Sequence, residues 1–176
     1  ARRTISAQGQ IVAPGFIDIH THSDFPLPLN PRAESKVRQG VTTEVVGNCG
    51  FSVAPALPGR ADVLREYLAS SAPWLSFHES TFAEYVAAFP PTSVNVILQV
   101  GHHTLRLMTA GMDKRPLTDA ERAAMEQLLE EALRAGAWGL STGLFTAPGG
   151  YADAGEIHAL ARVLARHRAG YASHIR

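Results

Sequence analysis

The alternation of strand-like and helix-like segments constrains the fold of this chain more than any other feature. Five short apolar or β-branched runs predict strands at residues 16–20, 41–46, 94–100, 137–140 and 171–175. Capping signals or helical apolar spacing predict helices at residues 32–39, 62–69, 81–89, 118–136 and 153–170. Strands that alternate with helices pair in parallel through crossover connections, so we expect an α/β fold.

Two α/β architectures fit this order, a doubly wound sheet and part of a (β/α)8 barrel. The polar residues separate them, because active residues of a barrel occupy the carboxyl ends of its strands. Polar side chains follow the predicted strands here: His20 and His22, Asn48 and Cys49, His102 and His103, Ser141 and Thr142, and His174. A doubly wound dinucleotide site would instead have a glycine-rich turn after its first strand. That position holds a His-Thr-His sequence, so we predict the barrel.

A histidine pair, His20 and His22, ends the first predicted strand. Residues two apart in a strand share a face and lie about 6.6 Å apart, which lets both imidazoles reach one metal ion. A bare His-x-His sequence is more often a pair of solvated side chains. The stretch from Pro14 to Asp18 places this pair at the mouth of a buried strand, so we predict that both histidines bind metal. Asp18 is expected to support them from the same face.

Two further residues are candidate metal ligands. Cys49 stands between Asn48 and Gly50 in the turn after the second strand, and the pattern fits both a metal-bound thiolate and a small packing residue. His174 ends the fifth strand. A histidine there is usually structural, but its place on the same rim as the first histidine pair makes it a candidate ligand.

Other histidines and aromatic residues receive structural interpretations. His103 follows the third strand in a predicted loop, where we expect it to be solvated. Four aromatic residues lie in the long connection after the second strand and are expected to pack in the interior, not to bind substrate: Trp74, Phe77, Phe82 and Tyr85.

Composition excludes several classes of function. The chain has 176 residues, 45% of them hydrophobic and 18% charged, which suits one globular domain. A formal net charge of zero argues against nucleic acid or an anionic membrane as a partner. No apolar run approaches the roughly 18 residues of a membrane span, and the start has no apolar signal segment. The single cysteine, Cys49, indicates either a reducing compartment or a functional thiolate, and we expect a cytoplasmic protein.

Four segments resemble the D-aminoacylase (N-acyl-D-amino-acid deacylase) family of the amidohydrolase superfamily. These segments are Ala13–His22, Gln39–Ser52, Gly139–Leu144 and Ser173–Arg176. The Pro-Gly-Phe-Ile-Asp-x-His-x-His start is shared across the superfamily. The Gly-Asn-Cys-Gly-Phe-Ser sequence is much more specific to this family.

The resemblance implies a partial TIM-like (β/α)8 barrel, with about five of the eight strands in this chain. Residues 1–12 would be the end of a small β-domain, and residues 13–176 the N-terminal part of the barrel. The resemblance also implies that zinc is held by His20, His22, Cys49 and His174. It implies a small-molecule substrate, an N-acyl-D-amino acid, whose N-acyl amide bond is hydrolysed by activated water while a carboxylate moves the proton.

The chain departs from the family pattern at several places. A further histidine ligand and the catalytic aspartate of the family would follow Arg176, so no catalytic residue is assigned here and we expect an N-terminal fragment that is incomplete for catalysis. Thr146 stands where the family often has tyrosine, and His103 where a small residue is more usual.

Two alternative functions stay open. A hydantoinase- or dihydroorotase-like cyclic amidase resembles this pattern too, but those enzymes use a carbamylated lysine after the fourth strand. No lysine occurs between Ala137 and Arg176. The other alternative is a non-catalytic metal-binding fragment.

Overall fold

The predicted strands form one parallel sheet. The computed structural model describes residues 3–76 and 78–175, so Phe77 and Arg176 lie outside the described residues. Its strands are β1 (Phe16–Asp18), β2 (Val41–Val46), β3 (Asn95–Gly101), β4 (Gly139–Gly143) and β5 (Gly170–His174). They lie in the order β1-β2-β3-β4-β5, and each neighbouring pair is parallel. This is the wall of a half-barrel with helices, which confirms the predicted fold class.

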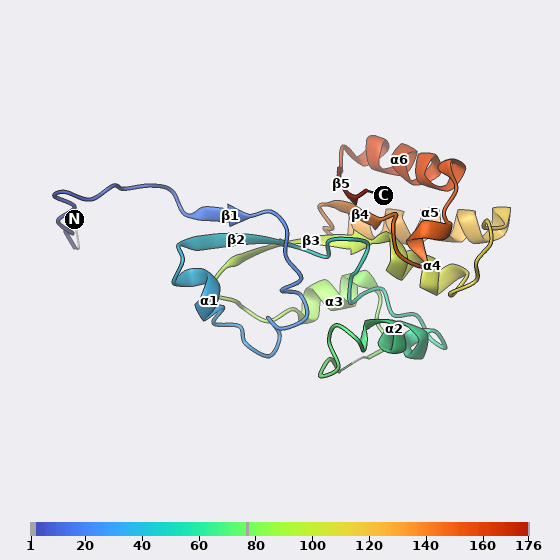
Figure 1. The fold of residues 1–176 in the computed structure, drawn as a ribbon, viewed down its shortest axis with the longest axis horizontal. Helices are drawn as coiled ribbons and strands as arrows, with labels where there is room; N and C mark the ends of the chain where they lie inside the picture. The colour runs from blue at the N-terminus through green and yellow to red at the C-terminus, as the bar shows by residue number, and fades with distance from the viewer. Residues whose placement is uncertain (1–2, 77, 176) are drawn as a thin grey trace.

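Helices connect the strands and cover the sheet (Figure 1). They are α1 (Glu34–Val37), α2 (Ala61–Leu68), α3 (Phe82–Ala88), α4 (His102–Thr109), α5 (Asp119–Arg134) and α6 (Ala154–His167), with the 3-10 turn η1 (Gly149–Tyr151). Thr81 and Thr118 form the predicted capping boxes at the starts of α3 and α5. Helix α5 therefore begins one residue after its predicted cap.

Helix α4 is a feature that the sequence did not predict. It follows β3 directly, and its first position is preceded by Gly101, which offers no capping side chain. Residues 102–108 are all buried, so the helix lacks the polar face that marks an amphipathic pattern. The expectation that His103 is solvated in a loop is wrong, because His103 is fully buried in this helix.

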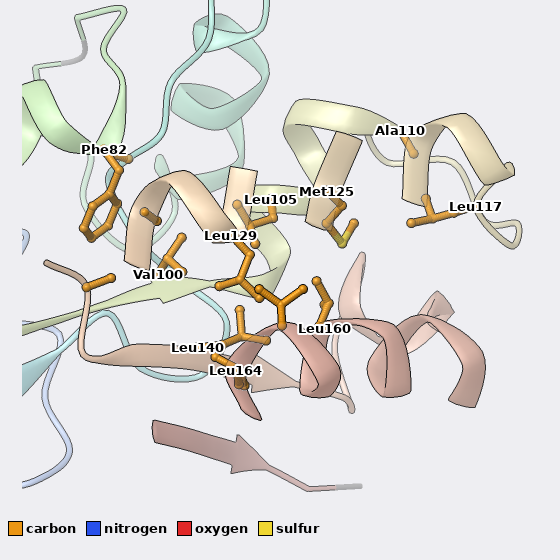
Figure 2. Close-up of a cluster of buried hydrophobic side chains, with 14 residues drawn as sticks. Phe82, Val100, Leu105, Ala110, Leu117, Met125, Leu129, Leu140, Leu160 and Leu164 are labelled. Carbon is orange, nitrogen blue, oxygen red and sulfur yellow. The ribbon is translucent and has the colours of Figure 1, made fainter. Parts of the chain in front are cut away.

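The main hydrophobic core lies between the sheet and helices α4, α5 and α6. Figure 2 shows Leu105, Met125 and Leu129 in one buried cluster with Val100 on β3 and Leu140 on β4. Each of these five side chains is fully buried. The core therefore fixes the helical layer against the side of β3 and β4 and leaves their carboxyl ends free to carry a site.

The segment before β1 lies apart from this core. Residues 3–15 form neither helix nor strand, and in Figure 1 they extend away from the sheet. The assignment of residues 1–12 to a small β-domain stays a prediction. Among the described residues, none of the helices combines the length and hydrophobicity needed to cross a bilayer.

We expect Leu129→Ala in the full-length protein to lower the free energy of unfolding by about 2–5 kcal/mol, because it leaves a cavity in the main core. Leu29→Ala is the matched control, since Leu29 is 67% exposed. Thermal unfolding monitored by circular dichroism gives the melting temperatures of both variants. Equal melting temperatures for the two variants would contradict the described core.

Candidate metal centre

Three of the predicted ligands meet beyond the carboxyl ends of β1 and β2. The ligand atoms of His20, His22 and Cys49 lie within 4.8 Å of one another. Nε2 of His20 is 3.1 Å from Sγ of Cys49. The buried Nδ1 of His22 has no hydrogen-bond partner among the described residues. Imidazole nitrogen and thiolate sulfur are the donors that zinc prefers, so the group fits this ion.

A tight turn presents the Cys49 side chain. Gly47 and Gly50 have φ of 75° and 83°, and Cys49 between them has φ of 55°, in the left-handed region that non-glycine residues rarely adopt. The amide of Asn48 stabilises the turn by donating to the carbonyl oxygens of Val45 (2.9 Å) and Thr21 (3.2 Å). This pairing holds the turn after β2 against the loop that carries the two histidines.

The fourth predicted ligand approaches from β5. Nδ1 of His174 lies 3.4 Å from Sγ of Cys49, and His174 pairs in register with Gly143 of β4. The ring of Phe145 lies beside the His174 imidazole, with a centroid distance of 4.1 Å. The structure thus brings His174 to the thiol but leaves it outside the three-residue cluster. Three of the four predicted ligands thus lie together and the fourth contacts the thiol, and metal binding by the four residues stays a prediction.

Asp18 supports the site through the backbone. Its Oδ1 accepts a hydrogen bond from the backbone N–H of His20 at 3.3 Å, and its Oδ2 accepts one from Lys36 at 2.7 Å. The hydrogen bond from Lys36 is the main reason why the pKa of Asp18 lies below its usual value. The ionised carboxylate therefore ties β1 to α1 and fixes the backbone of His20.

Burial shapes the electrostatics of the ligands themselves. Burial raises the pKa of the Cys49 thiol, and burial followed by the nearby His20 charge lowers the pKa of His22. Without a cation, the protein thus favours a neutral thiol and a neutral imidazole. A bound cation favours the thiolate and the neutral imidazole, which are the forms that ligate metal.

Sequence reasoning missed the role of His103 beside this site. Its Nε2 donates to the carbonyl oxygen of Gly143 at 2.7 Å, and its Nδ1 is hydrogen-bonded to the hydroxyl of Tyr67 at 2.6 Å. A Cβ atom at Gly149 would lie 2.1 Å from the ring, and one at Gly50 would lie 2.7 Å from it. These glycines form a slot for the imidazole, and their clustering after β2 and β4 is the sequence signal that could have found it.

A buried ion pair anchors the helix that carries His103. Nε2 of His102 lies 2.6 Å from Glu156, and Arg106 pairs with the other oxygen of the same carboxylate. All three side chains are almost fully buried. Because removal of one partner leaves an uncompensated buried charge, this group fixes the start of α4 against α6.

The aromatic residues in the connection after β2 differ in their burial. Phe82 and Tyr85 pack in or against the main core, as predicted. The prediction is wrong for Trp74, which is 53% exposed and lines a pocket together with His22. Phe77 lies outside the described residues.

Comparison with known proteins identifies the family. A family model described as "Amidohydrolase family" matches residues 3–174. The chain belongs to this amidohydrolase family. Its sequence is 46% identical to N-acyl-D-aspartate deacylase and 44% identical to N-acyl-D-glutamate deacylase, both from Alcaligenes xylosoxydans xylosoxydans. These matches cover 98% and 100% of this chain but only 34% and 36% of the relatives, so the amidohydrolase chain spans about a third of their length.

Solved structures agree with this membership. An N-acyl-D-glutamate deacylase from Bordetella bronchiseptica, complexed with zinc and a phosphonate inhibitor that mimics the tetrahedral intermediate, matches with a TM-score of 0.81 and 44% identity. The match covers 97% of this chain and 35% of that one. A D-aminoacylase crystal structure matches with a TM-score of 0.79 and 40% identity, over 93% of this chain and 34% of the other.

We expect Gly149→Ala to destabilise the full-length amidohydrolase by about 1–3 kcal/mol, because the new methyl group would collide with His103. Gly150→Ala is the control, since the nearest atom to its Cβ is 3.5 Å away. Melting temperatures report the difference. A Gly149→Ala protein as stable as the Gly150→Ala protein would show that the slot is not tightly packed.

Low pH is expected to lower the stability of the folded protein, because it protonates the buried ring of His103. Burial lowers the pKa of His103 to about 4, below the value of about 6.5 in an unfolded chain. The neutral ring therefore contributes up to about 3 kcal/mol above pH 6.5, and this contribution is lost as pH falls toward 4. Melting temperature should fall more steeply over this window in the wild type than in His103→Asn. Parallel pH curves for the two proteins would exclude this contribution.

Proposed function

We propose that the full-length protein is a zinc-dependent hydrolase that cleaves the N-acyl amide bond of N-acyl-D-amino acids. The observation that carries this proposal is the meeting of His20, His22 and Cys49 at the carboxyl edge of the sheet. The membership of the amidohydrolase family and the similarity to three deacylases of D-amino-acid derivatives support it.

The proposed ligands of the ion are His20, His22, Cys49 and His174. The unpartnered Nδ1 of His22 and the short approach of His20 to the thiol support this assignment. At such a site zinc supplies Lewis-acid polarisation of a carbonyl group and activation of water. A cytoplasmic location is proposed as well, because ligation by Cys49 requires a reduced thiol.

The residues of this chain contribute binding and orientation. Asp18 holds the backbone of His20, and the left-handed turn holds the Cys49 side chain toward both histidines of the first strand. His103 fixes the carbonyl of Gly143, next to the register position of His174. The carboxylate that the family resemblance implies for proton transfer is not assigned to a residue of this chain.

The cyclic-amidase alternative has less support. It requires a carbamylated lysine after β4, and the chain has no lysine from Ala137 onward. The proximity of Cys49 to His20 and His22 supports the thiol as the further ligand instead. The non-catalytic alternative predicts zinc binding without hydrolysis, so the experiment below separates it from the proposed function.

We expect Cys49→Ala in the full-length protein to lower zinc per chain and to abolish most hydrolysis of N-acetyl-D-amino acids, because a soft ligand is lost. Cys49→Asp should retain more zinc, since a carboxylate can also ligate. Elemental analysis gives the metal content, and ninhydrin detection of the released amine gives activity.

His158→Ala is the matched control for a His20→Ala variant, because His158 is exposed on α6 and far along the chain from the cluster. The control should keep its zinc, whereas His20→Ala should lose it. Unchanged zinc and unchanged hydrolysis in Cys49→Ala would remove Cys49 from the site. Full zinc content without hydrolysis of any N-acyl-D-amino acid by the wild type would support the non-catalytic alternative.

A further inference from the structure

An aromatic pocket opens directly beside the candidate metal centre. It has a volume of about 390 Å³ and is lined by His22, Phe25, Pro26, Phe51, Ser71 and Trp74. His22 belongs to both the pocket and the metal-ligand cluster. A group held in this pocket is therefore adjacent to any bond that is broken at the metal centre.

The inner walls of the pocket are held rigidly. Phe51 packs edge-on against His22 at a centroid distance of 5.7 Å and stacks on Tyr67 at 5.5 Å. The buried ring of His103 contacts Phe51 from another side at 5.3 Å, and its hydrogen bond to Tyr67 fixes both partners. Phe51 is thus clamped by three rings, and the pocket is formed before any ligand binds.

The remaining walls differ in exposure. Phe25 is only 5% exposed and stacks on the His22 ring at 5.9 Å. Trp74 is 53% exposed although it is a large apolar side chain, so it stands at the open side of the pocket. A wall of one buried and one half-buried phenyl ring, with an exposed indole at the entrance, is a surface that gains free energy when a ligand covers it.

The residues that line the pocket favour an apolar ligand over a charged one. Apart from His22, its polar member is Ser71, and it contains no lysine or arginine. A carboxylate placed here would lose its hydration without gaining a cationic partner. An apolar chain or ring, by contrast, would exchange water for aromatic contacts.

We propose that this pocket binds an apolar group of the substrate that is attached to the scissile amide, and that Trp74 and Phe51 determine which groups are accepted. The inference rests on the proposed deacylase function. Two parts of the substrate have this chemistry, the acyl group and an apolar amino-acid side chain. An acidic side chain does not fit, so a substrate with such a side chain places its acyl group in the pocket.

The test compares substrates that differ in one part only. In the first series the amino acid is constant and the acyl group changes from acetyl to phenylacetyl. In the second series the acyl group is acetyl and the amino acid changes from D-alanine to D-phenylalanine. Each series is measured with the zinc-loaded full-length wild type, Trp74→Ala and Trp74→Phe. The control is Trp138→Ala, because Trp138 is similarly exposed (51%) and immediately precedes β4, at the amino end of the sheet.

We expect Trp74→Ala to lower kcat/KM for the bulky member of one series by about tenfold, while the small member changes by less than about twofold. Trp74→Phe should restore most of this selectivity, and Trp138→Ala should leave it unchanged. The series that responds identifies the group in the pocket. The proposal would be overturned if Trp74→Ala lowered kcat/KM equally for the small and bulky members of both series, or lowered it in neither series.

A binding measurement separates this inference from the proposed function. Calorimetric titration of the metal-depleted protein with phenylacetamide and acetamide needs no turnover. Phenylacetamide should bind about tenfold more tightly than acetamide to the wild type, and this preference should be lost in Trp74→Ala. If the wild type hydrolyses no N-acyl-D-amino acid but keeps this preference, the deacylase function fails and the apolar pocket stands. If the protein hydrolyses them and shows no preference in either measurement, the pocket proposal fails alone.

Discussion

The parallel register of β1 to β5 is the constraint on which the candidate site depends. Each strand enters the sheet from the same end, so the residues after each strand arrive at one edge. The register places His174 opposite Gly143, and the turn after β2 brings Cys49 between the first histidine pair and His174. The Cys49 thiol therefore contacts side chains from positions as distant as 20 and 174.

Close backbone packing at this edge gives the site its rigidity. Gly101 has no room for a side chain, because a Cβ atom there would lie 2.2 Å from the carbonyl oxygen of Gly50. The same crowding surrounds His103, whose neutral ring joins β4 to α2 through Gly143 and Tyr67. The ring also supports Phe51, so the support of the metal centre and the wall of the neighbouring pocket are one packed unit. A change in this unit is expected to affect both stability and substrate choice.

Much of the fold could be predicted because its signals are local. The His20 and His22 pair follows from a spacing of two residues, and the capping box at Thr118 predicts the start of α5. Helix α4 and the burial of His103 were missed, since the glycines and the tyrosine that enclose the ring are far away in the sequence. The sequence around Cys49 fits both a metal ligand and a packing residue. The short distances from its sulfur to His20 and His174 support the ligand.

The most direct test of this account is zinc K-edge X-ray absorption on the full-length protein. We predict a coordination shell that contains one sulfur at about 2.3 Å together with imidazole nitrogens at about 2.0–2.1 Å. The sulfur contribution should disappear in Cys49→Asp while the nitrogen shell remains. A shell of nitrogen and oxygen alone in the wild type would contradict the central claim that the turn after β2 supplies a thiolate to the metal.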